Sequence, residues 1–351
     1  MLKELLLIDW RNHARTRVEI NSGATIIYGP NGSGKTNIIE AISVLSVGKS
    51  WRERSKGLLM REGSDSGVIR ATYEEDLYEI QVQPRSFSVE KNSKKQSLKS
   101  HMGSIPTLLF APEHLHIFRG TKAERMGFLD RFLYQISPTY RAHLSITLKA
   151  IRSRNTLLKA DIPPHRNEIE PWEIIIAEHL PMVTSARMEI MKQLTPLLQK
   201  AYRDISTTEE MVDMQLKIGE DYTPTTEGIN EFFDTNRQRE MAARRTLVTP
   251  TRDDIVFFLR GKTLTSTASR GEERSALLSL LTAMRQHMNT REMAPIMLLD
   301  DVFSELDDTR QQCLSALCEG CQTIITTTHA EHFRAFAGAT AIAIHDIINK
   351  A

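Results

Sequence analysis

Hydrophobic and polar positions in the first 110 residues predict mainly β-strands. The segments LKELLLID, RTRVEI and ATIIYG come first, and VIRATY, LYEIQVQ and FSVEK follow with period-two alternation and short turns between them. One helix interrupts the strands over residues 37–47, where apolar side chains recur at 38, 39, 42, 45 and 47. We expect this helix to pack its apolar stripe on a sheet.

Helical spacing replaces the strand pattern between residues 119 and 246. Pro181 and Pro196 are expected to end or kink one of these helices, because proline lacks the backbone N–H and clashes with the preceding turn. No heptad pattern lasts long enough to predict an extended coiled coil. Four helical segments are predicted here: residues 128–136, 138–159, 171–205 and 226–246.

Strand-like sequence returns after residue 246. The segment IVFFLRGKTL predicts a hairpin that turns at Gly261 and Lys262. A helix over residues 272–288, the strand PIMLLD, a helix over residues 307–319 and the strand QTIITTT are predicted to follow. Strand-rich sequence therefore flanks the helical block on both sides.

This order of patterns predicts an α/β protein with a helical insertion. At roughly 150 residues per domain, a chain of 351 residues is expected to form two units, or one unit with a large insertion. We expect a discontinuous unit made of residues 1–118 and 247–351, and a helical insertion domain over residues 119–246.

The composition excludes several classes of protein. Hydrophobic residues at 40% and charged residues at 25% are typical of globular proteins. No apolar run approaches the roughly 18 residues that cross a bilayer, and MLKELLLIDW lacks the pattern of a secretion signal. Cys313, Cys318 and Cys321 form a poor disulfide framework and lack the paired spacing of a zinc site. We expect a cytoplasmic protein without a membrane segment.

A glycine-rich loop at residues 29–36, GPNGSGKT, lies between the strand ATIIY and the helix that follows. Glycine, four residues, glycine, lysine and threonine in this context form a phosphate loop. Backbone N–H groups and the positive end of the helix dipole surround phosphate oxygens. Lys35 would bind the outer phosphates and Thr36 would ligate Mg²⁺, so the loop predicts ATP binding.

A second acidic element ends the apolar run IMLLDD at residues 296–301. The run is typical of a buried parallel strand. Asp300 would support the Mg²⁺ held by Thr36, and Asp301 would orient or deprotonate the attacking water. The alternative is a strand that ends in a solvated turn. Some 260 residues separate this element from the phosphate loop, which again predicts an inserted domain.

A third element, TSTASRGEERS at residues 265–275, directly precedes an apolar-striped helix. Ser269 and Gly271 at the helix start would form a second anion site. Because the phosphate loop already supplies one such site, a second one makes sense if it caps the nucleotide of another subunit.

Taken together, these motifs make the sequence resemble the ATPase heads of the ABC and SMC-like superfamily, and within it the RecF family of bacterial recombination mediators. The resemblance covers nearly the whole chain. It rests on WRNH at 10–13, GPNGSGKTNIIEAI at 29–42, GKSWR at 48–52, FAPEHL at 110–115, RMGFLDRFL at 125–133, RSRNTLLK at 152–159, TPTRDDIVFFLRGK at 249–262, the signature, and LLDDVFSELDDTR at 298–310.

The resemblance implies an ABC/SMC-type P-loop ATPase head and gives its site residues by matching motif positions. It implies a signature acting on the partner's nucleotide through Ser269, Gly271 and Glu272, with Ser304, Glu305, Leu306 and Asp307 meeting their counterparts across a dimer. It implies Mg²⁺ held by Thr36 and Asp300, and catalysis by Asp301, Lys35 and the switch histidine His329. The implied ATP contacts are Gly29, Pro30, Asn31, Gly32, Ser33, Gly34, Lys35, Thr36, Asn37, Arg11 and Asn12.

The implied function is an ATP-dependent DNA-binding switch. By resemblance, an ATP-driven homodimer would bind double-stranded and gapped DNA, work with RecR and RecO in loading RecA, and reset by slow ATP hydrolysis. Two rivals are another SMC-like DNA repair head, which would require long heptads, and the ATP subunit of a membrane transporter, which would require a glycine-pair signature.

The net charge of +1 does not indicate a DNA partner, but its distribution is uneven. Residues 119–160 hold nine Lys or Arg against two acidic residues, a local excess of +7 that could neutralise DNA phosphates. The alternative is a solvated helical face with counter-charges nearby in space. The candidate DNA contacts are Arg52, Arg141, Lys149 and Arg152.

Overall fold

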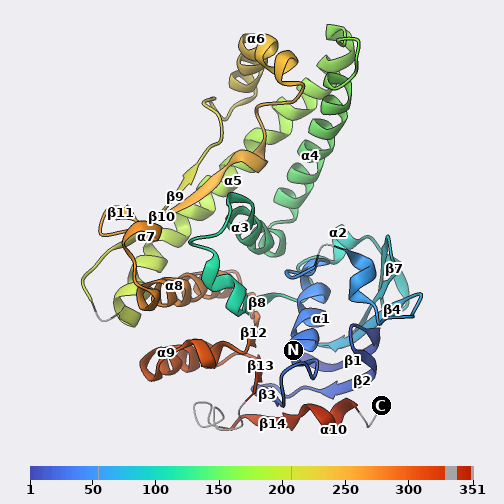
Figure 1. Ribbon diagram of the computed structural model, residues 1–351, viewed down its shortest axis with the longest axis vertical. Coiled ribbons are helices and arrows are strands. Elements are labelled where there is room, and N and C mark those ends of the chain that lie inside the picture. Colours follow the sequence, from blue (N-terminus) through green and yellow to red (C-terminus); the bar gives the residue numbers. More distant parts are fainter. Residues whose placement is uncertain (54, 207, 329–337, 349–351) are drawn as a thin grey trace. The chain divides into compact units, whose positions relative to one another are not determined.

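The computed structural model describes residues 1–53, 55–206, 208–328 and 338–348. Within it the chain forms two compact units, shown as ribbons in Figure 1. Unit 1 is built from residues 1–116, 204–207 and the chain from 270 onward, and unit 2 from residues 117–203 and 208–269. The expected discontinuous head of residues 1–118 and 247–351, with a helical insertion domain over residues 119–246, stays a prediction.

Unit 1 contains a five-stranded parallel sheet in the order β14-β3-β13-β12-β8. Every neighbouring pair in it is parallel, so the carboxyl ends of the strands lie at one edge. The strand that precedes the phosphate loop and the strand that ends in Asp300 therefore flank a single strand between them. The sheet consists of β3 (Ala24–Tyr28), β8 (Thr107–Phe110), β12 (Ile296–Asp300), β13 (Thr323–Thr327) and β14 (Thr340–Ala343).

A second sheet in unit 1 is antiparallel and has six strands in the order β2-β1-β4-β5-β6-β7. It confirms the strands that period-two alternation predicts early in the chain. Its strands are β1 (Leu2–Trp10), β2 (His13–Glu19), β4 (Gly67–Tyr73), β5 (Asp76–Val82), β6 (Phe87–Lys91) and β7 (Lys94–Gln96).

Helix α1 (Lys35–Val47) is almost completely buried within unit 1. Eleven of its 13 residues are buried, and its apolar side chains share one core cluster with side chains from both sheets. A helix that is buried on nearly all sides positions its first turn rigidly, and that turn carries the phosphate loop. The remaining helical elements of unit 1 are η1 (Lys56–Leu59), α2 (Leu98–His101), η2 (Pro112–His116), α8 (Arg270–Asn289), η4 (Val302–Glu305), α9 (Asp308–Cys318) and α10 (Ile344–Ile348).

Unit 2 is mainly helical and also holds a three-stranded sheet in the order β11-β10-β9. The sheet contains one strand that the sequence analysis missed, β9, although Val212, Met214 and Leu216 alternate with polar residues there. The elements are α3 (Lys122–Ile136), α4 (Pro138–Leu158), α5 (Arg166–Ser206), β9 (Val212–Lys217), α6 (Thr226–Ala243), η3 (Pro250–Arg252), β10 (Asp254–Leu259), β11 (Lys262–Thr263) and α7 (Leu264–Thr267).

Helix α5 does not end at its prolines. It runs for 41 residues through Pro171, Pro181 and Pro196. Of the expectation that Pro181 and Pro196 end or kink this helix, the ending is wrong, and the kink stays a prediction. One face of α5 is buried along its length, which offsets the hydrogen bond lost at each proline.

Arg154 on α4 is a buried ion-pair centre of unit 2. Its guanidinium donates to Glu173 and to Glu240, each at 2.6 Å, and to the Thr246 hydroxyl at 3.0 Å. It also lies over the Phe233 ring, 4.7 Å from the centroid. Because the side chains of Arg154 and Glu240 are 1% and 0% exposed, the positive charge of Arg154 is paired in the interior of unit 2.

Arg187 on α5 forms a second buried centre. It donates to Asp253 at 2.7 Å, to Asp130 at 3.0 Å, to the Tyr140 hydroxyl at 2.9 Å and to the Pro250 carbonyl at 2.8 Å. These contacts connect α3, α4, α5 and the segment before β10. Arg187 therefore fastens the elements of unit 2 to one another.

Candidate nucleotide site

The phosphate loop follows β3, where its glycines adopt conformations that side chains avoid. Gly29 has φ +154° and Gly34 has φ +101°. A Cβ on Gly34 would lie 2.6 Å from the Asn12 amide oxygen and 2.7 Å from His13 Nε2, and a Cβ on Gly29 would lie 2.4 Å from Ile344 Cγ2. Glycine is therefore required both by the turn and by close packing.

Lys35 is the first residue of α1, and its side chain turns back into the loop. The ammonium donates to the Gly29 carbonyl at 2.8 Å and to the Pro30 carbonyl at 2.9 Å, and the residue is buried. Burial lowers the pKa of Lys35, and the negative charges of Asp301 and Asp300 oppose that shift. The loop thus encloses a cation next to two carboxylates.

Asp300 at the end of β12 joins the acidic strand to the phosphate loop. Its Oδ1 accepts hydrogen bonds from the Thr36 hydroxyl at 2.8 Å and from the Thr326 hydroxyl at 2.6 Å. Burial raises the pKa of Asp300, and these two hydrogen bonds oppose the rise. Two motifs 264 residues apart therefore meet at one atom, with Thr326 of the intervening strand β13 beside them.

Asp301 follows directly and has left-handed backbone geometry, with φ +46°. Its backbone N–H donates to the Thr326 carbonyl at 3.0 Å. A non-glycine residue in this region is uncommon, and such strain concentrates at functional sites. Asp300 accepts the hydrogen bond from Thr36, and the charges of both Asp301 and Asp300 act on Lys35, with that of Asp301 the larger.

The tip of the β1–β2 hairpin is packed against the phosphate loop. Trp10 Nε1 donates to the Asn37 carbonyl at 2.8 Å, and Asn37 Nδ2 donates to Asn12 Oδ1 at 2.8 Å. His13 Nε2 lies 3.1 Å from the Gly34 carbonyl, and its Nδ1 lies 2.9 Å from the Thr16 hydroxyl. Since a carbonyl can only accept, the Nε2–H tautomer satisfies both contacts. Burial lowers the pKa of His13, which keeps this neutral form.

Arg11 is held by a buried carboxylate on α1. Its guanidinium donates to both oxygens of Glu40, at 2.8 and 2.7 Å, and to the Leu58 carbonyl at 2.8 Å. Ser50 donates to the same carboxylate at 2.5 Å. The fully buried carboxylate of Glu40 therefore fixes the orientation of the Arg11 guanidinium.

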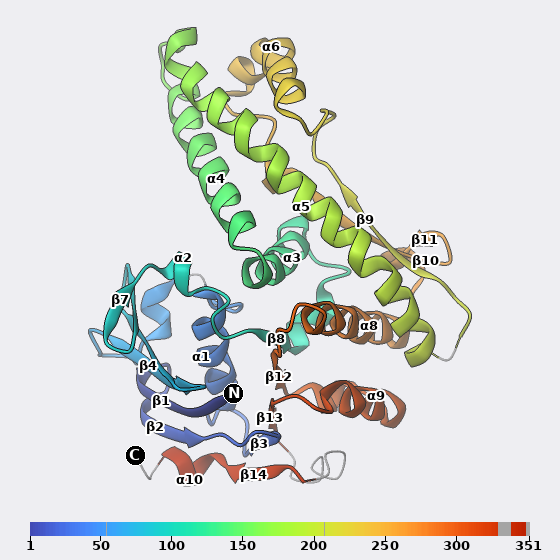
Figure 2. The same ribbon diagram turned by 180° about the vertical axis from the view of Figure 1, so that it is seen from behind.

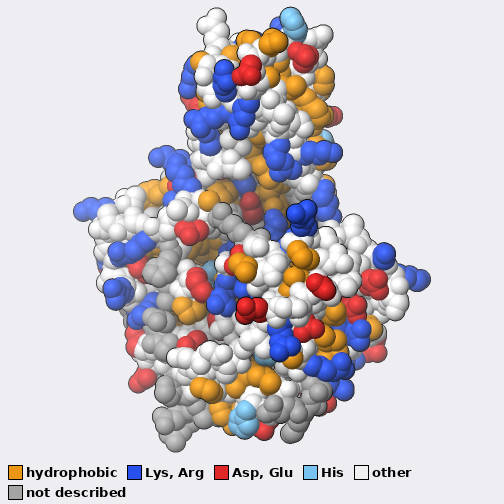
Figure 3. Space-filling view, turned by 45° about the vertical axis from the view of Figure 1, so that its right-hand side comes forward, with side chains coloured by type: hydrophobic (Ala, Val, Ile, Leu, Met, Phe, Trp, Pro, Cys, Tyr) orange, Lys and Arg blue, Asp and Glu red, His pale blue; other side chains and the backbone are white. Residues whose placement is uncertain are grey.

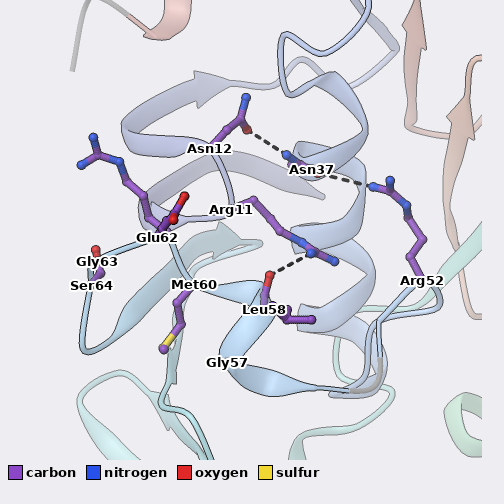
Figure 4. A pocket seen from close by; sticks show the side chains of 11 residues that line it. Arg11, Asn12, Asn37, Arg52, Gly57, Leu58, Met60, Glu62, Gly63 and Ser64 are labelled. Atoms are coloured by element: carbon purple, nitrogen blue, oxygen red, sulfur yellow. Dashed lines mark hydrogen bonds between the residues drawn. The ribbon is translucent and has the colours of Figure 1, made fainter.

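A pocket of about 970 Å³ adjoins these residues, within unit 1 (Figure 4). Arg11, Asn12, Asn37 and Arg52 lie along it, and Arg52 donates to Asn37 Oδ1 at 3.4 Å. The rest of the lining comes from Gly57, Leu58, Met60, Arg61, Glu62, Gly63 and Ser64. The pocket combines apolar side chains with amide and guanidinium donors next to the first turn of α1.

The predicted signature residues lie at the start of α8. The helix begins at Arg270, so Ser269 directly precedes it, and Gly271 and Glu272 belong to its first turn. The helix therefore begins two residues before the predicted start at residue 272. His329, the candidate switch histidine, lies outside the described residues.

The four candidate DNA contacts are placed very differently. Arg141 is buried, 8% exposed, and donates to the Tyr134 carbonyl at 2.5 Å. Lys149 and Arg152 are exposed on α4. Arg52 lies at the pocket, 3.8 Å from Glu113.

Part of the +7 excess over residues 119–160 is neutralised inside unit 2. Arg154 pairs with Glu173 and Glu240, and Arg125 pairs with Asp254 at 2.7 and 3.0 Å. Counting charges along the sequence could not reveal these partners, because they come from distant segments. The excess available to a ligand is therefore smaller than the sequence suggests.

Three residues of the site were missed by sequence reasoning. Glu40 is a carboxylate within the apolar stripe of a helix, and such a position signals a buried partner. Thr326 belongs to a run of threonines at the end of a strand next to the acidic one. His13 ends the motif WRNH, but only the fold brings its ring to the phosphate loop.

Among the helices of the described residues, none combines the length and the apolar character of a membrane-spanning segment. Within the same part of the chain, no group of three or more His, Cys, Asp or Glu side chains is arranged to hold a metal ion. The carboxylate of Asp300 and the hydroxyl of Thr36 fit the oxygen preference of Mg²⁺, which in phosphate-transfer sites is completed by substrate phosphates and water.

Proteins similar to this one match it over nearly its whole length. Residues 1–348 match the profile of the "RecF/RecN/SMC N terminal domain". The DNA replication and repair protein RecF of Streptococcus suis is 34% identical over 342 residues, covering 94% of this chain and 93% of that protein. The protein of the same name from Moorella thermoacetica is 32% identical over 339 residues, covering 93% and 90%.

Two solved structures share the fold of this chain. A structure described as the recombination mediator protein RecF-ATPrS in the RecFOR pathway has a TM-score of 0.87 and 25% identity, and covers 98% of this chain and 96% of that one. An Smc head domain from Pyrococcus furiosus has a TM-score of 0.55 at 14% identity, covering 98% and 93%, which shows a shared fold alone. The predicted ABC/SMC-type ATPase head is confirmed.

Proposed function

The chain belongs to the RecF family, and from this premise we propose that it is an ATP-dependent DNA-binding switch of DNA replication and repair. The observation that supports this most strongly is the hydrogen bond from Thr36 to Asp300, which unites the phosphate loop with the acidic strand. Structures of relatives described as RecF-ATPrS and RecF-ATP support ATP as the nucleotide.

Lys35 would be the main phosphate ligand. Its ammonium bonds two loop carbonyls at 2.8 and 2.9 Å, and an incoming phosphate would compete for those N–H donors. A charge-assisted bond to phosphate is stronger than one to a neutral carbonyl. Backbone N–H groups at the start of α1 would bind the remaining oxygens.

Thr36 and Asp300 would hold Mg²⁺, which when bound neutralises charge on the outer phosphates. Asp300 accepts from both Thr36 and Thr326 and is oriented before any ligand arrives. Asp301 lies one residue later and would orient the attacking water and accept its proton.

The pocket beside Arg11 and Asn12 would take the nucleoside part of ATP. It begins at Asn37, directly after Thr36. Leu58 and Met60 supply apolar surface for a flat base, and the guanidinium of Arg11 supplies donors that Glu40 holds in place. Arg52 lines the same pocket and donates a hydrogen bond to Asn37 there.

The signature residues Ser269, Gly271 and Glu272 would act on the nucleotide of a second copy. Closing a dimer around two nucleotides gives ATP contacts that exist only in the closed state, so ATP shifts the population toward it. Hydrolysis removes those contacts and resets the switch. His329 would sense the terminal phosphate in the role that the family resemblance implies.

DNA would bind to the closed dimer. On the face drawn in Figure 3, Lys and Arg side chains are spread over the surface with acidic groups among them. Lys149 and Arg152 are exposed and available to phosphates, whereas Arg141 is buried. Double-stranded and gapped DNA, with RecR and RecO as partners in loading RecA, complete the proposal. The similar structure described as RecF-ATPrS in the RecFOR pathway supports RecR and RecO as partners.

The test is DNA binding by filter retention, with ATP, with ADP and without nucleotide, across a salt series. Phosphate contacts predict tight binding with ATP that weakens steeply as salt rises. Affinity that is indifferent to both nucleotide and salt would contradict the proposed switch.

A further inference from the structure

Arg310 on α9 lies between the signature helix α8 and residues 304–307, the SELD segment, and the family resemblance implies that both contact a partner subunit. Its Nε donates to the Ser275 hydroxyl on α8 at 3.0 Å, and another guanidinium nitrogen contacts the Asp307 carboxylate at the end of the SELD segment. α8 and α9 lie side by side in Figure 1 and, from behind, in Figure 2. One side chain thus joins the signature helix to the SELD segment.

Gly271 of the signature lies next to the Arg310 guanidinium, at a position where a side chain would be close to it. A Cβ added there would lie 3.2 Å from Arg310 Nη2, closer than most carbon contacts allow. Glycine therefore lets the guanidinium approach the first turn of α8. The same position would be occupied by a methyl group if Gly271 were alanine.

The other end of the connection is fixed as well. The Asp307 side chain accepts from the Arg310 backbone N–H at 3.0 Å, and this bond lowers the pKa of Asp307 together with the Arg310 charge. Gln311 donates to the carbonyls of Phe303 and Leu306 at 3.2 and 3.0 Å. The backbone of the SELD segment is therefore tied to the first turns of α9.

We propose that Arg310 is a positioning residue that holds the signature and the SELD segment in one fixed relation, so that both meet the partner subunit at once. This inference rests on the proposed dimer. Two contact surfaces that are aligned before association lose less conformational freedom on binding. The guanidinium suits this role because its planar fork serves two acceptors in different directions. Lysine would keep the charge but not the two-sided geometry.

The experiment compares wild type, Arg310→Lys and Ser275→Ala by sedimentation with a non-hydrolysable ATP analogue, alongside nucleotide affinity measured by fluorescence. We expect both variants to bind nucleotide within about twofold of wild type, because Arg310 does not touch the phosphate loop. Dimerisation of Arg310→Lys should weaken about tenfold, the equivalent of one charge-assisted hydrogen bond. Arg17→Lys is the matched control, because Arg17 is exposed and forms an ion pair with Glu4.

The double variant distinguishes a bridge from a general loss of stability. If Arg310 acts through Ser275, adding Ser275→Ala to Arg310→Lys costs little more than Arg310→Lys alone. Additive losses, or an Arg310→Lys protein that dimerises as wild type does, would overturn the inference. A wild-type protein that stays monomeric would instead overturn the proposed dimer, and this inference with it.

Discussion

In unit 1 the charged residues of the sequence motifs meet at the edge of a parallel sheet, whereas in unit 2 two arginines are buried in ion pairs: Arg154 within the basic segment (residues 119–160) and Arg187 outside it. Lys35 and Asp300 lie where their motifs predict. Arg154 and Arg187, by contrast, bind carboxylates from distant segments. The difference shows that a motif tied to a backbone turn can be read from the sequence, while a sum of charges cannot.

The largest expected effect lies in unit 2. Arg187→Ala leaves the buried Asp253 and the partly exposed Asp130 without their cation, so the free energy of unfolding should fall by about 3–5 kcal/mol. Chemical denaturation measures it. Arg166→Ala on the same helix is the control, since its ion pairs are exposed and should contribute less than about 1 kcal/mol. Equal effects of the two substitutions would contradict the structural role of Arg187.

The next effect concerns unit 1. Lys35→Ala removes the ammonium of the phosphate loop and should weaken ATP binding by about 100-fold or more, with little loss of stability. Titration with a fluorescent ATP analogue measures the change. Lys3→Ala is the control, since Lys3 forms an exposed ion pair with Glu75. Retained affinity in Lys35→Ala would show that the loop is not the phosphate site.

A smaller effect should follow pH through His13. Its folded pKa is lowered by burial, so the unfolded chain takes up a proton first as pH falls. The contribution of His13 to the free energy of unfolding is complete above about pH 6.5 and is lost as pH falls through the lowered folded pKa. The free energy of unfolding, measured between about pH 7.5 and pH 5, should therefore change less with pH in His13→Gln than in the wild type. The exposed His345→Gln should keep the wild-type slope.

The smallest effect tests how the basic segment is used. Lys149→Ala and Arg152→Ala should each reduce the slope of log affinity for DNA against log salt by about one. Arg141→Ala should leave that slope unchanged and lower stability instead, because Arg141 is buried. Filter binding across a salt series measures all three slopes. A reduced slope in Arg141→Ala alone would reverse this assignment.

Much of unit 1 could be predicted because its elements have local signals. The phosphate loop carries its own glycines, and the strand before Asp300 is an uninterrupted apolar run. The meeting of Thr36 with Asp300 follows from parallel strands that share one carboxyl edge. What the sequence could not give was Glu40 behind Arg11 and His13 against Gly34, since both contacts depend on how the hairpin packs on α1.

Unit 2 was harder to predict because its determinants are long-range. The continuity of α5 through three prolines depends on a face buried by other elements. Strand β9 pairs with β10, which lies more than 35 residues further along the chain. In the sequence, Arg125 and Arg154 resemble surface charges, because their ion-pair partners Asp254 and Glu240 come from distant parts of the chain.

The most direct test of the nucleotide switch is the mass of the purified protein in solution, measured by sedimentation with a non-hydrolysable ATP analogue and with ADP. We expect a dimer with the analogue and a monomer with ADP, and we expect Ser269→Ala to bind the analogue but stay monomeric. A wild-type protein that remains monomeric when saturated with the analogue would contradict the account.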